Sequence, residues 1–135
     1  MDILFLDDDP ARQKIFQSNC PSATIVATSA ECINKLTNAV WDIVFLDHDL
    51  GGEIFVDSNR EDTGMEVARW LSVNKKEIGQ IIVHSHNPAG AANMSSLLKA
   101  SGYNTLEVPF SWFRSDGIFE QLAKKVNNDI AGHKE

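Results

Sequence analysis

Short apolar runs separated by helix-length stretches are the main pattern along this chain of 135 residues. The runs are rich in branched and aromatic residues and are apolar at successive positions, which is typical of strands buried on both faces of a parallel sheet. The pattern predicts strands at Ile3–Leu6, Thr24–Ala27, Ile43–Leu46, Ile81–Val83 and Thr105–Val108, of which the second is weaker and the fifth is a further candidate.

Capping signals mark the starts of helices between these runs. Asp9 followed by Pro10 predicts a cap and a first helical residue, and so a helix near Ala11–Ser18. The capping-box spacing Ser/Thr-x-x-Glu predicts two more helices, and an Asn-Pro pair predicts another. These three helices are expected to start at Thr28, Thr63 and Asn87. A last helix is indicated by apolar residues at helical spacing: Phe119, Leu122, Ala123, Val126 and Ile130.

Strands and helices therefore alternate five times along the chain. This alternation predicts an α/β fold, a doubly wound, five-stranded parallel sheet with helices on both faces. No internal repeat or linker divides the sequence. We expect one domain over residues 1–130, followed by a short C-terminal tail at 131–135.

Composition and charge narrow the class of protein. Hydrophobic residues make up 43% and charged residues 23%, which is an ordinary globular balance. The formal net charge is −7 and the basic residues are scattered, which argues against a nucleic acid as the main partner. Cys20 and Cys32 form no Cys-x-x-Cys pair, which excludes zinc-finger and thioredoxin chemistry and fits a cytoplasmic location. No apolar run approaches the roughly 20 residues of a membrane helix.

Acidic and histidine side chains gather at the predicted carboxyl ends of the strands, where open α/β sheets bind their ligands. The first strand ends in Asp7-Asp8-Asp9, the third in Asp47-His48-Asp49 and the fourth in His84-Ser85-His86. Simpler roles exist for some of them. Asp9 fits a helix cap, Asp49 the start of a turn and His84 a core histidine.

Asp7, Asp8 and Asp47 are harder to explain in that way. Carboxylates packed in a poorly solvated pocket cost several kcal/mol without a counter-charge. No lysine or arginine is adjacent to them in the sequence. A bound divalent metal is the simplest solution, and oxygen ligands suit Mg²⁺ or Mn²⁺, whereas added histidines shift the preference to Mn²⁺, Fe²⁺ or Zn²⁺.

Five segments resemble the landmarks of response-regulator receiver domains, which have a flavodoxin-like fold. They are ILFLDDDP, DIVFLDHDLGG, TGMEVARWL, IIVHSHNP and VPF, and the resemblance extends over about residues 2–127. It implies that Asp7 and Asp8 hold a divalent metal such as magnesium, that Asp47 accepts a phosphoryl group, and that the hydroxyl of Ser85 contacts this group.

Three features depart from ordinary receivers. Val108 stands where receivers carry a lysine before the proline that follows the fifth strand. The histidines His48, His84 and His86 are additional. The segment 50–62 is longer than usual and contains Arg60, a candidate for the missing positive charge. With these departures, the chain resembles a divergent receiver-like group associated with the processing of cyclic phosphates.

Three functions remain open. The first is a metal-dependent phosphoesterase that acts on a cyclic or other small-molecule phosphate, with the metal on Asp7, Asp8, Asp47 and Asp49. Its catalytic residues would be Asp47, His48, His84, Ser85 and His86. The second is a stand-alone receiver of two-component signalling, phosphorylated on Asp47 by a phosphodonor protein. The third is a non-catalytic adaptor that binds a partner through the aromatic segment Pro109–Phe113.

Overall fold

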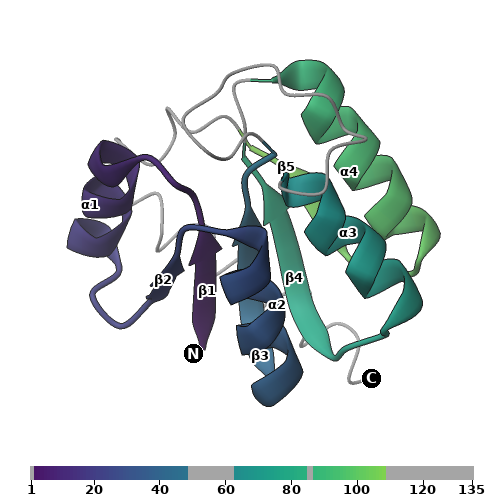
Figure 1. Cartoon of the computed structure of the whole chain (residues 1–135), viewed down its shortest axis with the longest axis horizontal. Coiled ribbons are helices and arrows are strands. Elements are labelled where there is room, and N and C mark those ends of the chain that lie inside the picture. Colours follow the sequence, from purple (N-terminus) through teal and green to yellow (C-terminus); the bar gives the residue numbers. More distant parts are fainter. Residues whose placement is uncertain (1, 49–62, 85–86, 109–135) are drawn as a thin grey trace, which may run out of the picture.

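Five parallel strands form one sheet in the order β2-β1-β3-β4-β5 (Figure 1). The computed structural model describes residues 2–48, 63–84 and 87–108. The strands are β1 Ile3–Leu6, β2 Thr24–Val26, β3 Trp41–Leu46, β4 Ile78–Val83 and β5 Thr105–Glu107. This order is that of the flavodoxin-like doubly wound fold, so the predicted fold class is confirmed.

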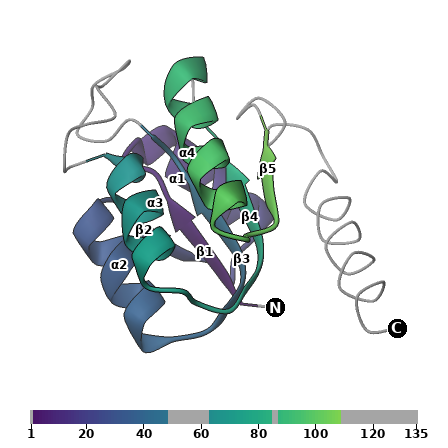
Figure 2. The same cartoon turned by 90° about the vertical axis from the view of Figure 1, so that its right-hand side faces the viewer.

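In the described part of the chain, four helices cover the sheet, with α1 on one face and the other three on the opposite face (Figure 2). They are α1 Pro10–Asn19, α2 Ser29–Asn38, α3 Gly64–Val73 and α4 Pro88–Ala100. Under α1 lies an aromatic core, in which the rings of Phe5 and Phe16 stack with their centroids 3.9 Å apart. Among the described residues, no helix has the length and apolar character needed to span a bilayer.

Two strands start earlier than the apolar pattern predicts, because polar residues interrupt that pattern. β3 begins at Trp41 and β4 at Ile78. Gln80 is buried, and its side-chain amide donates a hydrogen bond to the backbone oxygen of Asn104 at 2.9 Å. A buried polar side chain with such a partner fits within a strand. The predicted helix over residues 119–130 lies outside the described residues.

The predicted caps are confirmed except at Thr63. The side chains of Asp9, Thr28 and Asn87 each accept a hydrogen bond from a backbone amide of the helix that they precede. Thr63 is the N-cap residue of α3 but is fully buried and makes no side-chain cap hydrogen bond, so the capping-box prediction was wrong there.

Backbone packing places the start of α3 directly on the end of β3. The amide of Gly64 donates to the carbonyl oxygen of His48 at 2.8 Å. A Cβ atom at Gly64 would lie 1.8 Å from the carbonyl oxygen of Asp47, so only glycine fits at this point. The helix therefore fixes the backbone that carries Asp47.

Candidate functional site

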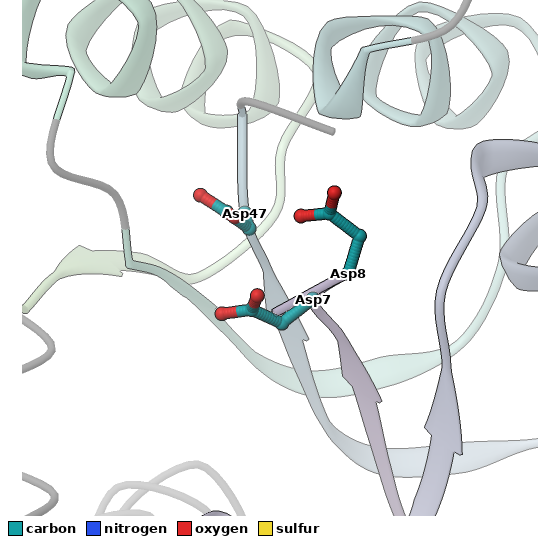
Figure 3. A group of neighbouring side chains, drawn as sticks. All are labelled: Asp7, Asp8 and Asp47. Atoms are coloured by element: carbon teal, nitrogen blue, oxygen red, sulfur yellow. The ribbon is translucent and has the colours of Figure 1, made fainter. Parts of the chain in front are cut away.

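Three carboxylates meet where the strand order reverses, between β1 and β3. Asp7 and Asp8 follow β1, and Asp47 follows β3, whose Leu46 pairs with Leu6. One carboxylate oxygen from each of the three lies within 4.8 Å of the other two (Figure 3). The structure thus brings together three of the predicted metal ligands at the position where doubly wound sheets bind ligands.

Asp7 has no exposed surface, and both of its carboxylate oxygens have partners. Oδ1 accepts from the backbone amide of Asp9 at 2.9 Å and from Nη2 of Arg12 at 2.9 Å. Oδ2 accepts from Nε of Arg12 at 2.7 Å and lies 3.2 Å from Nε2 of His84. Burial raises the pKa of Asp7, but the hydrogen bonds from His84 and Arg12 outweigh it. The net pKa is lowered, so the carboxylate is ionised at neutral pH.

Arg12 is a site residue that inspection of the sequence missed. Its guanidinium makes a bidentate contact with the carboxylate of Asp7, and Nη2 also lies 3.3 Å from Oδ2 of Asp47. Burial opposes the charge of Arg12, but the hydrogen bond and charge of Asp7 and the charge of Asp47 raise its pKa. Arg12 is not adjacent to any of the three aspartates in the sequence. The usable signal was Asp9-x-x-Arg12, a pair that shares the first turn of a capped helix, and these two side chains are 3.6 Å apart.

His84 joins the acidic cluster from the end of β4. It is almost fully buried, and its ring stacks on Phe5 with the centroids 4.8 Å apart and the planes at 7°. Its backbone amide donates to the carbonyl oxygen of Leu46 at 2.9 Å, which fixes it beside β3. His84 is therefore both a histidine of the aromatic core and a direct neighbour of Asp7.

His48 lies on the other side of the sheet. Because successive residues point to opposite faces, Asp47 faces the α1 side and His48 faces α3 and α4. The fully buried ring of His48 packs on Gly90, and its Nδ1 is 3.5 Å from Nδ2 of Asn87. The structure gives His48 a packing role beneath α4, and its catalytic role stays a prediction.

Val108 is buried in the aromatic core, and its amide donates to the carbonyl oxygen of Val83 at 2.9 Å. The position at which the resemblance to receivers leads us to expect a lysine thus carries a side chain with no charge. The other predicted site residues, Asp49, Ser85 and His86, lie outside the described residues, as does Arg60.

The donor set of the cluster fits a hard cation. Among the described residues, the groups that can share one ion are three carboxylates, and no histidine belongs to the set. His84 contacts Asp7 instead. All-oxygen ligands favour Mg²⁺ or Mn²⁺ over Zn²⁺. Asp8 is only partly buried, so the cluster is open to solvent on its side.

Comparison with known structures identifies the same fold in response regulators. A CheY-like receiver domain from Methanospirillum hungatei is 16% identical, with a TM-score of 0.64, and covers 97% of each chain. The response regulator TrrA from Thermotoga maritima, in complex with Mg²⁺ and BeF, is 21% identical, with a TM-score of 0.64, over 93% of this chain and 97% of that one. The response regulator domain of Thermotoga maritima CheB is 12% identical, with a TM-score of 0.58, over 95% and 94%.

A search of curated protein sequences gave no match. In contrast, the model of a protein family, described as the cyclic-phosphate processing receiver domain, matches residues 2–100. This match includes β1, β3 and β4, with Asp7, Asp8, Asp47 and His84 at their ends. The chain is therefore a divergent receiver-like domain and belongs to the family of cyclic-phosphate processing receiver domains.

Proposed function

We propose that this domain is a metal-dependent phosphoesterase that acts on a cyclic or other small-molecule phosphate. The observation that carries the proposal is the contact between His84 and Asp7, with Nε2 of His84 3.2 Å from Oδ2. It adds a titratable imidazole to a carboxylate cluster that would suffice for a receiver. The family match supports the choice of a cyclic phosphate.

Asp7, Asp8 and Asp47 would hold the divalent ion, with Asp49 as a further candidate outside the described residues. Among the solved structures, TrrA was determined with Mg²⁺ and BeF, which supports an ion in a site of this fold. A divalent ion supplies positive charge that polarises a phosphoryl group. Phosphoryl transfer depends mainly on positioning and electrostatics, so a few well-placed groups are sufficient.

The proton-transfer step is assigned to histidines of the chain. His84 is the described histidine that contacts the cluster, so we assign to it the proton for the leaving oxygen, held between its Nε2 and Oδ2 of Asp7. Asp7 orients this ring by its contact, and stacking on Phe5 keeps it fixed. His86 is the second candidate for proton transfer and follows the same strand in the sequence.

The alternative function is a stand-alone receiver that is phosphorylated on Asp47 by a phosphodonor protein. The same three carboxylates favour it, because a receiver needs a metal beside the phosphorylated aspartate. Against it stands buried Val108. The loss of the ammonium at this point removes about 1.5–3 kcal/mol of charge-assisted contact to the phosphate. The adaptor function would use the segment Pro109–Phe113, which lies outside the described residues.

One assay separates the enzyme from the receiver. Purified protein is incubated with 2′,3′- and 3′,5′-cyclic nucleotides in Mn²⁺ or Mg²⁺, and ring opening is followed by ³¹P NMR. We expect turnover that Asp47→Asn reduces at least about 100-fold, the scale of one electrostatic group in a transition state. Asp42→Asn, the same change at the start of β3, should retain activity.

The same preparation is then incubated with a small phosphodonor and Mg²⁺, and its intact mass is measured. A stable phosphate adduct without any ring opening would replace the enzyme proposal with the receiver alternative. Ring opening that is equal in the wild type and in Asp47→Asn would contradict the role of this cluster in the reaction.

A further inference from the structure

Arg12 is a positive charge built into the acidic cluster. We propose that its guanidinium and the divalent ion compete for Asp7 and Asp47, so that ion binding frees Arg12 to contact the phosphate. Arg12 would thus take over the task of the lysine that Val108 replaces. The inference rests on the ion site of the proposed function, and it concerns how that site is controlled.

The competition follows from the oxygens that Arg12 occupies. Its two contacts of 2.7 and 2.9 Å take both oxygens of Asp7, and a third of 3.3 Å reaches Asp47. Two of the three carboxylates that an ion would bind are therefore already paired with one cation of the protein. An ion on the same oxygens would stand a few Å from the guanidinium, where like charges repel. One of the two cations must then give way.

Arg12 is able to move without disturbing the fold. It lies in the first turn of α1, and its side chain keeps 18% exposure. The carboxylate of Asp9, which is 42% exposed, lies 3.6 Å from Nη1 and offers a partner on the solvent side. A rotation of the long side chain towards Asp9 would release Asp7 and Asp47 and still leave the guanidinium paired.

Before its release, the guanidinium already lies beside the reacting group, so only a short movement separates it from a bound phosphate. Nη2 of Arg12 is 3.3 Å from the carboxylate of Asp47, the residue that receivers use to carry phosphate. Arginine binds phosphate oxygens through paired N–H donors, which makes it a suitable replacement for lysine. Among the described residues, Arg12 is the arginine or lysine that contacts the cluster. Both the position and the chemistry of Arg12 fit a phosphate contact.

A purely structural role for Arg12 makes the opposite prediction for the ion. If Arg12 only held the cluster together, its removal would disorder the carboxylates and weaken ion binding. If Arg12 competes with the ion, its removal tightens ion binding and weakens phosphate binding. The direction of the change in ion affinity therefore decides between the two roles.

The test measures binding of Mn²⁺ alone, by electron paramagnetic resonance of the free ion, to wild type, Arg12→Gln and Arg12→Lys. We expect Arg12→Gln to bind Mn²⁺ about tenfold more tightly, the change that corresponds to losing one charge-assisted contact. Arg12→Lys keeps the positive charge without the paired donors of the guanidinium, so its Mn²⁺ affinity should lie between those of the wild type and Arg12→Gln. Lys14→Gln is the matched control, because it removes one exposed charge from the same helix.

Inorganic phosphate is then titrated at saturating Mn²⁺, where Arg12→Gln should bind it several-fold more weakly than wild type. Unchanged or weaker Mn²⁺ binding in Arg12→Gln overturns the inference, and so does an equal gain in Lys14→Gln, which would be a general charge effect. Tighter Mn²⁺ binding without any phosphoesterase turnover would leave the competition standing and refute the enzyme. Phosphoesterase turnover together with an unchanged Mn²⁺ affinity in Arg12→Gln would refute the competition and leave the enzyme proposal standing.

Discussion

Asp7 is the residue on which the described site depends. Its oxygens accept hydrogen bonds from Arg12 and from the amide of Asp9, and they contact His84. A carboxylate buried in this way is stable only while its partners remain, because breaking a buried charge pair costs more than the pair contributes. The three partners come from the N-cap of α1, from α1 itself and from the residue that follows β4, so Asp7 joins these elements as well as contributing to the site.

The lowered pKa of Asp7 predicts how the free energy of unfolding changes with pH when a chelator keeps the site free of metal. The folded state holds this proton less tightly than the unfolded state, so the contribution of Asp7 is present above the ordinary aspartate pKa of about 4. It is lost as the pH falls through the lower folded value. Asp7→Asn should cost about 1.5–3 kcal/mol of unfolding free energy at pH 7, because the charge-assisted hydrogen bonds of the buried carboxylate are lost.

Urea unfolding of wild type and Asp7→Asn, with EDTA at several pH values from 7 to 3, measures this effect. The difference between the two proteins should shrink as the pH falls. A difference that stays constant over that range would show that the ionised form of Asp7 has no special stability in the fold.

At the scale of elements, two glycines set how closely the helices approach the site strands. Gly64 allows α3 to contact the backbone of Asp47, and Gly90 allows α4 to contact the ring of His48. His48 and Asp47 are neighbours in the sequence but serve opposite faces of the sheet. The packing of α4 on His48 thus supports the strand end that presents Asp47 on the other side.

Gly90→Ala tests this packing. Its Cβ would lie 2.5 Å from the imidazole of His48, which is fully buried and has little room to shift. We expect a loss of about 1–3 kcal/mol in unfolding free energy, the cost of overpacking a core, despite the higher helix propensity of alanine. Urea unfolding of Gly90→Ala, His48→Ala and the double variant gives a double-mutant cycle. The double variant should be more stable than the sum predicts, whereas additive effects would contradict the contact.

At the scale of the whole molecule, the sequence was sufficient for the fold because each level of signal agreed. Apolar runs, capping residues and alternating elements all predict the same sheet, and the sheet order then brings Asp7 and Asp47 to one edge. The contact of Arg12 with Asp47 was beyond sequence reasoning, since it joins residues from different elements and depends on the direction of a side chain. The face of the sheet on which His48 and His84 lie can likewise be assigned only once the register of the strands is known.

The proposed chemistry depends on Asp7, Asp8 and Asp47 forming one ion site. A crystal structure of the protein grown with Mn²⁺, with anomalous differences recorded at a wavelength where manganese scatters strongly, tests it directly. We predict one strong peak in contact with all three carboxylates and a guanidinium of Arg12 displaced from Asp7. A peak elsewhere, or none between these carboxylates at saturating Mn²⁺, would contradict the account.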